Sequence, residues 1–220
     1  MYLTRFRFNP ARRGARKLLA SPQAMHAAVR AAFGAPDGYE RSGSRALWRV
    51  DTSTHDTVHL YLVSPGRPDL THMVEQAGWP TTEAWDVREY DPLLAKLDAG
   101  QRWAFRLTAN PTHSGRKAVD AKETQRFGYL RPAEQVDWLL NRGGRCGFAV
   151  AKQDDGTPNI GVTRRQTLVF KRDMATVTLT TATFDGVLEI QDAVAFRAAL
   201  TSGIGPAKAY GCGLLTLAHP

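Results

Sequence analysis

Hydrophobic and polar positions alternate along the first part of the chain in a way that predicts a small sheet with two helices. Strand-like alternation occurs in four segments, at residues 2–8, 45–51, 57–63 and 83–90. Apolar residues follow helical spacing in two further stretches, at residues 21–33 and 69–77. The resulting order is β-α-β-β-α-β, which is the order of a ferredoxin-like unit.

The helix predicted at 21–33 has well-defined ends. Ser21 is the expected N-cap and Pro22 the first-turn residue, because both residue types favour those positions. The helix is expected to end near Gly34. The segment before it, NPARRGARKLLA at residues 9–20, is expected to be a basic loop.

The same order recurs in the second half of the chain with additional strands. Strands are expected at 101–111, 147–151, 166–171, 175–183, 186–190 and 213–218, and helices at 132–143 and 192–200. A long polar loop is expected between residue 111 and Leu130. We therefore predict an α+β fold of two tandem ferredoxin-like (RRM-like) domains, 1–92 and 99–220, with extra β-hairpins in the second.

The charge distribution indicates a polyanionic partner. The 220 residues carry a net charge of +8, with 11 basic and 4 acidic residues in 1–68, 2 and 7 in 69–98, and 16 and 10 in 99–220. Two basic regions separated by an acidic one are typical of a nucleic-acid-binding protein. A generally basic surface without a specific partner is the alternative.

The sequence shows no targeting signal and no cysteine pattern that would indicate a function. No apolar run approaches the roughly 20 residues of a membrane helix, and the N-terminus lacks the apolar block of a signal peptide, so a cytoplasmic protein is expected. Cys146 and Cys212 are too few for a disulfide framework or a four-cysteine zinc site.

His26 is the first candidate for chemistry. It lies at the edge of the apolar face of the 21–33 helix, with Arg30 one turn later and the basic segment 12–17 before it. An imidazole beside a guanidinium suits proton transfer at a phosphate, since the arginine holds the anion while the histidine moves the proton. A helix-edge histidine in an ordinary hydrogen bond is the alternative.

The sequence holds no motif for metal chemistry. His55 and His59 are four residues apart on a predicted strand, which separates them by about 13 Å. Asp154 and Asp155 precede Gly156 and are read as a turn. A nuclease without metal or other cofactor would favour RNA, whose 2′-hydroxyl is a built-in nucleophile.

Glycines and paired basic residues mark possible contacts with a phosphate backbone. Gly203, Gly205, Gly211 and Gly213 surround Lys208, which suits either a phosphate or a helix C-cap before a final strand. Basic pairs flank a predicted strand and occupy the polar loop, at Arg164, Arg165, Lys171, Arg172, Arg116 and Lys117. Such pairs contact RNA phosphates or are simply solvated hairpin ends.

Four segments together resemble the CasE family, the CRISPR RNA-processing endoribonucleases of type I-E systems. They are MYLTRFRFNP at the start, SPQAMH at 21–26, FRLTANPT at 105–112 and GIGPAKAYGCGLLTLA at 203–218. The last is close to the family signature over its whole length, and the resemblance covers essentially the full chain. It implies metal-independent cleavage of CRISPR repeat RNA at the base of a stem-loop, giving a 2′,3′-cyclic phosphate and a 5′-hydroxyl.

The resemblance also implies partners and site residues. The product crRNA is expected to stay bound, and the protein to join the multi-subunit complex Cascade. His26 matches the family's catalytic histidine and Lys208 the loop near the RNA. The residues expected to bind RNA are Arg12, Arg13, Arg16, Lys17, Arg30, Arg116, Lys117, Arg164, Arg165, Lys171, Arg172, Gly203, Gly205 and Lys208.

One position departs from the family pattern. Gln23 stands where members often carry a tyrosine, and an amide cannot exchange protons as a phenol can. Water, Tyr2 or a basic residue is the expected substitute, and His113 is expected to assist phosphate binding at most. A non-catalytic RNA-binding subunit is therefore the second hypothesis, and a metabolite-binding ferredoxin-like module the third.

Overall fold

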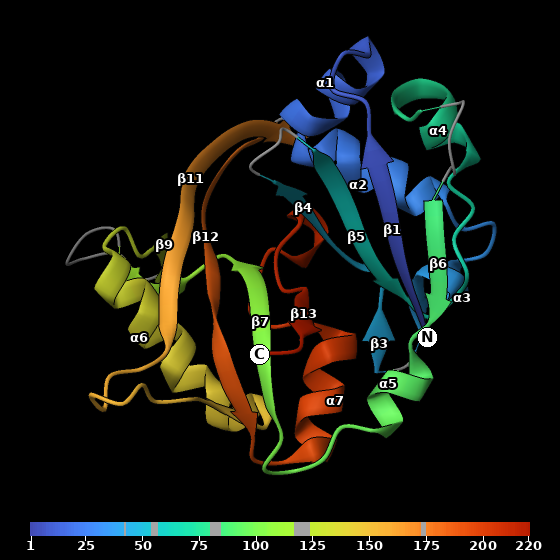
Figure 1. Cartoon of the computed structure of the whole chain (residues 1–220). Helices are drawn as coiled ribbons and strands as arrows, with labels where there is room; N and C mark the ends of the chain where they lie inside the picture. Colours follow the sequence, from blue (N-terminus) through green and yellow to red (C-terminus); the bar gives the residue numbers. More distant parts are fainter. Residues whose placement is uncertain (42, 54–56, 80–84, 117–123, 173–174) are drawn as a thin grey trace.

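Two antiparallel sheets with helices packed on them form the main body of the fold (Figure 1). The computed structural model describes residues 1–41, 43–53, 57–79, 85–116, 124–172 and 175–220. The α+β class expected from the sequence is confirmed. Within the described residues, no helix has both the length and the apolar character needed to cross a membrane.

The first sheet has the strand order β4-β5-β1-β6, with antiparallel neighbours throughout. Its strands are β1 (Tyr2–Phe8), β4 (Leu47–Thr52), β5 (Val58–Ser64) and β6 (Trp85–Glu89). All four lie where alternation predicted them, within two residues at each end. On β1 the alternation separates buried Phe6 and Phe8 from exposed Arg5 and Arg7.

Helices α2 (Pro22–Ala31) and α4 (Thr71–Ala77) supply the other side of this core. Both helices were expected from the sequence. The Ser21 hydroxyl accepts a hydrogen bond from the Ala24 amide at 3.2 Å, which confirms the predicted N-cap. Met25 and Val29 are fully buried and join the core formed by the β1 phenylalanines. The polar edge of α2, which carries His26, is thereby left facing outward.

The segment expected to be a basic loop instead forms helix α1 (Arg13–Ala20). Alanine, arginine, lysine and leucine are good helix formers, and Ala15 and Leu18 are buried one turn apart. Gly14 lets α1 approach α4 closely, since a Cβ there would lie 2.1 Å from the Gln76 carbonyl oxygen. Because the segment carries many charges, its sequence did not indicate a helix, although one side of α1 is apolar.

Four further elements of the first half were not expected. The short helix α3 (Pro36–Tyr39) and the two-stranded sheet of β2 (Glu40–Arg41) and β3 (Ser44–Arg45) lie between α2 and β4. Helix α5 (Asp91–Ala95) occupies the acidic stretch expected at the domain boundary.

The second sheet has the order β10-β12-β7-β13, and β11 pairs with the remaining length of β12. Its strands are β7 (Arg102–Ala109), β10 (Phe148–Val150), β11 (Ile160–Arg172), β12 (Ala175–Ile190) and β13 (Leu215–Ala218). Helices α6 (Pro132–Gly143) and α7 (Ala193–Ser202) confirm the two predicted helices. Asp192 caps α7 by accepting from the Val194 and Ala195 amides.

Two predictions for the second half were wrong. The expected loop after residue 111 contains a hairpin of β8 (Thr112–Arg116) and β9 (Thr124–Gly128). The strands expected at 175–183 and 186–190 are one strand, β12, because Asp185 and Gly186 do not form a turn. Gly186 instead permits close backbone contact, since a Cβ there would lie 2.3 Å from the Asn159 carbonyl oxygen.

A buried arginine joins the two sheets. Arg49 on β4 has only 2% of its side chain exposed and donates to the carbonyls of Arg106 and Leu214, at 2.7 and 3.0 Å, and to the Thr216 hydroxyl, at 2.8 Å. Its charge is balanced by two hydrogen bonds to Asp51, both 2.7 Å.

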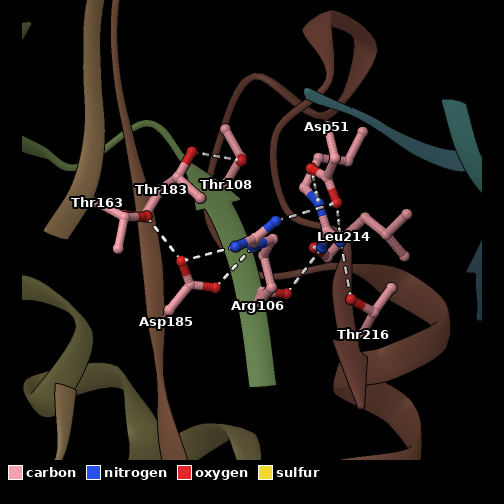
Figure 2. Close-up of polar contacts among 9 residues, drawn as sticks. Asp51, Arg106, Thr108, Thr163, Thr183, Asp185, Leu214 and Thr216 are labelled. Carbon is pink, nitrogen blue, oxygen red and sulfur yellow. Dashed lines mark hydrogen bonds and ion pairs between the residues drawn. The ribbon is translucent and has the colours of Figure 1, made fainter. Parts of the chain in front are cut away.

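The polar contacts continue from this junction onto the second sheet (Figure 2). Arg106 contacts both Asp51 and Asp185, and Asp185 also accepts from the Thr163 hydroxyl at 2.7 Å. Burial opposes ionisation of Asp185, but these hydrogen bonds outweigh it and lower the pKa of the carboxyl. The facing sides of the two sheets are thus held by a continuous network of charges and hydroxyls.

We predict that Arg49→Met destabilises the protein by about 3 kcal/mol. Methionine fills the space but leaves Asp51 and two inter-sheet carbonyls without their buried donor. Urea unfolding measures the change in stability. Arg88→Ala, at an exposed position of β6, is the control and is expected to destabilise the protein by about 0.5 kcal/mol or less. Equal stability of the two variants would contradict a structural role for the Arg49 junction.

Candidate functional site

His26 opens onto a cavity of about 680 Å³ at the edge of the first sheet. Four parts of the chain line it: α2, α3, the β2–β3 pair and the glycine-rich segment at residues 203–213. The polar lining residues are His26, Arg30, Tyr39, Glu40 and Arg45. The glycine-rich segment contributes Ala209, so the cavity draws on both halves of the chain.

The His26 ring is half-buried and is surrounded by aromatic groups. Its Nδ1 lies 3.4 Å from the Tyr39 hydroxyl, with the two ring centroids 6.0 Å apart in a T-shaped arrangement. The Tyr210 ring approaches from the glycine-rich segment, with its centroid 6.4 Å from that of His26. Sequence reasoning missed both tyrosines as neighbours of His26.

Positive charge gathers around this ring. The Arg30 guanidinium carbon lies 5.6 Å from the centre of the Tyr39 ring, and the Nε of Arg45 is buried with no hydrogen-bond partner among the described residues. Lys208 lies close enough to Arg45 for the two charges to repel. Burial, followed by that repulsion, lowers the pKa of the Lys208 ammonium. A bound phosphate could accept from Arg45, and its negative charge would offset the repulsion between Arg45 and Lys208.

Close packing against neighbouring side chains requires glycine at three positions of the segment 203–213. Gly203, Gly205 and Gly211 each have φ of 81°, and a Cβ at these positions would meet Leu47 at 2.6 Å, Trp138 at 2.8 Å and Trp48 at 2.6 Å. This packing accounts for the glycines without any ligand. It also presses the turn at Lys208–Tyr210 against α2 beside His26.

The first-half residues that were expected to bind RNA divide into two groups. Arg30 lines the His26 cavity, whereas Arg12, Arg13, Arg16 and Lys17 lie on or beside α1, outside its lining. Arg12 donates to the carbonyls of Val74 and Gly78, and Arg16 to that of Ala11. Arg13 and Lys17 are exposed on the helix.

The β11–β12 hairpin brings its basic residues toward the site. Arg164, Arg165 and Lys171 are exposed along β11, which arches toward α2 (Figure 1). The Phe170 ring contacts the Tyr210 ring with centroids 4.8 Å apart, which ties the hairpin to the turn next to His26. Lys117 lies outside the described residues, and for Arg116 and Arg172 only the backbone is described.

His113, His59 and Tyr2 lie outside the lining of this cavity. His113 packs against Phe127 and Tyr129 and lines a separate cavity with Arg126 and Arg142. Tyr2 is the first residue of β1, opposite Ser64, and is not one of the residues that line the His26 cavity. His59 lies on β5 as expected, and His55 is outside the described residues.

Within the described parts of the chain, no group of three or more His, Cys, Asp or Glu side chains could hold a metal ion. Asp155 accepts hydrogen bonds from the Thr157 amide and hydroxyl, which confirms the turn expected at 154–156.

Comparisons with known proteins place this chain in one family. The family model for CRISPR associated protein matches residues 1–219. CRISPR-associated endoribonuclease Cse3 of Thermus thermophilus is 32% identical over 225 aligned positions, covering 99% of this chain and all of that protein. Cascade subunit CasE of Escherichia coli is 36% identical over 185 positions, covering 79% of this chain and 89% of that protein.

Solved structures agree with these relatives. Cse3 bound to a 19-nucleotide RNA superimposes with a TM-score of 0.81 at 30% identity, covering 99% of this chain and 100% of that one. Cas6e of Escherichia coli gives a TM-score of 0.68 at 26% identity, with both chains fully covered.

We predict that Gly211→Ala destabilises the protein by about 1–3 kcal/mol more than Gly100→Ala. Both glycines have left-handed backbone, at φ 81° and 83°, so the cost of strain is shared. Only Gly211 would place its Cβ against Trp48, while nothing lies within 4 Å of a Cβ at Gly100. Denaturant unfolding of both variants measures the difference, and equal losses would show that the Trp48 contact does not constrain the segment.

Proposed function

Because the chain belongs to the family of CRISPR associated proteins, we propose that it is an endoribonuclease that cleaves CRISPR repeat RNA at the base of a stem-loop. Its relatives carry the names CRISPR-associated endoribonuclease and Cascade subunit. The observation that supports this function most directly is the position of His26, in a cavity shared with Arg30 and Arg45.

The reaction needs groups that these residues supply. The ribose 2′-hydroxyl attacks the adjacent phosphorus, the bond from phosphorus to the 5′-oxygen breaks, and the products are a 2′,3′-cyclic phosphate and a 5′-hydroxyl. His26 acts as general acid or general base in this transfer. Arg30 and Arg45 offset the charge that develops on the phosphoryl oxygens, in the manner of other preorganised cations.

We further infer that the chain consists of two ferredoxin-like domains, at 1–92 and 99–220. The strand orders support this, since in each sheet the first and third strands of the unit are central and the second and fourth are at its edges. The hairpins β8–β9 and β11–β12 are additions to the second unit. The site would then be assembled from both domains.

The RNA is proposed to extend from this cavity over the basic surfaces on either side. Electrostatic contact with phosphates supplies most of the affinity in such interfaces. The proposed contacts are Arg13, Lys17, Arg30, Arg164, Lys171, Lys208 and the backbone at Gly203 and Gly205. Arg12, Arg16 and Arg165 have a lesser part in this proposal, because backbone carbonyls already occupy some of their donors.

After cleavage, the protein is proposed to retain the crRNA stem-loop and to assemble into Cascade. The curated relative from Escherichia coli is named as a Cascade subunit, and a surveillance complex is among the solved structures that this chain resembles, at 25% identity. A non-catalytic RNA-binding role is less well supported, since both a sequence relative and a similar solved structure are named endoribonuclease.

We predict that His26→Ala lowers the single-turnover cleavage rate by at least about 100-fold, because general acid–base catalysis contributes that much or more. Binding of the repeat hairpin is expected to stay within about 2-fold. Gel analysis of the protein's own repeat RNA in EDTA measures cleavage, and the wild-type rate is expected to be unchanged by the chelator.

His113→Ala is the matched control, since it removes an imidazole outside the His26 cavity. It is expected to cut at close to the wild-type rate. Equal loss of cleavage and binding in His26→Ala would contradict a role in proton transfer.

A further inference from the structure

The Tyr39 hydroxyl lies beside His26 in the wall of the cavity. It is 3.4 Å from Nδ1, and the two rings meet in a T-shaped arrangement. We propose that Tyr39 is a positioning residue that holds the His26 ring through Nδ1 and stabilises its protonated form. The inference rests on the proposed function and assigns a new residue to it.

Tyr39 is itself held from several directions. Arg30 lies over its ring at 5.6 Å, and the Phe33 ring contacts it with centroids 5.9 Å apart. Its backbone carbonyl accepts from the Ala46 amide at 2.6 Å, which joins the end of α3 to the start of β4. The hydroxyl is therefore fixed relative to α2, as a positioning group must be.

The charges around His26 explain why a phenol suits this place. Arg30 approaches from α2, Arg45 from β3 and Lys208 from the turn that carries Tyr210, while Glu40 on β2 is the acidic residue in the described lining. In general, cations close to an imidazole disfavour a further positive charge on it. A carboxylate at Nδ1 would stabilise the imidazolium but also weaken the field that attracts phosphate. A phenol oxygen accepts from Nδ1–H without adding charge.

The contact also decides which ring nitrogen reacts. With Nδ1 directed at Tyr39, Nε2 on the opposite side of the ring exchanges the proton with RNA. A hydrogen bond from the charged imidazolium is stronger than one involving the neutral ring, so the hydroxyl favours the protonated form. Its removal therefore moves the titration of the reaction to lower pH, whether His26 gives or accepts the proton.

Tyr39→Phe tests this, because it keeps the ring contacts and removes only the hydroxyl. We expect a single-turnover rate about 10-fold lower, as part of the acid–base contribution is lost. The pH of half-maximal rate is expected to fall by about half a unit or more. Affinity for a repeat hairpin with 2′-deoxyribose at the cleavage position is expected to stay within about 2-fold of the wild type.

Tyr90→Phe is the matched control, since it removes a phenol hydroxyl from the hydrophobic core, outside the lining of the His26 cavity. Its rate and pH profile are expected to match the wild type. An unchanged pH profile in Tyr39→Phe would overturn the proposal, as would a rate loss explained by weaker RNA binding. If His26→Ala cuts as fast as the wild type, the proposed function itself fails, and this result is separate from that of Tyr39→Phe.

Discussion

The buried Arg49 junction is the interaction on which the site depends, because the cavity at His26 is built from both halves of the chain. Arg49 comes from the first sheet and binds two carbonyls and a hydroxyl of the second. Burying an unpaired arginine charge would destabilise the fold, and the ion pair with Asp51 offsets this cost of desolvation. The junction thereby fixes where the segment at 203–213 meets α2.

The site combines strong positive charge with uncharged hydrogen-bonding groups around one imidazole. Arg30, Arg45 and Lys208 offer the charge that a phosphate needs, and burial, followed by repulsion from Arg45, lowers the pKa of Lys208. Tyr39 and Tyr210 surround His26 without cancelling that charge. Electrostatic preorganisation of this kind is the main means by which enzymes stabilise developing charge.

Much of this could be predicted from local sequence patterns. Alternation located the strands of the first sheet, and Ser21 and Asp192 located two helix starts, because capping is a local interaction. The resemblance to the CasE family is confirmed by the matching family model and relatives. His26 was identified because it lies at the edge of an amphipathic helix, in a segment that resembles that family.

The rest depends on contacts between distant segments. Tyr39 follows Pro36 in a short excursion with no periodic pattern, so nothing local indicated that it reaches His26. Gly203, Gly205 and Gly211 lie against Leu47, Trp138 and Trp48, contacts that the sequence did not indicate, and ligand contact by this segment stays a prediction. Helix α1 was missed because its charges outnumber its two buried residues. The missed contacts and the missed helix all concern tertiary packing that a single sequence does not display.

The most direct test of the central claim is a structure of the protein bound to its repeat hairpin with 2′-deoxyribose at the cleavage position. The account predicts that the scissile phosphate group lies within about 3.2 Å of His26 Nε2, which is hydrogen-bonding reach. A phosphate bound more than about 6 Å from that ring, beyond even a single bridging water, would contradict it.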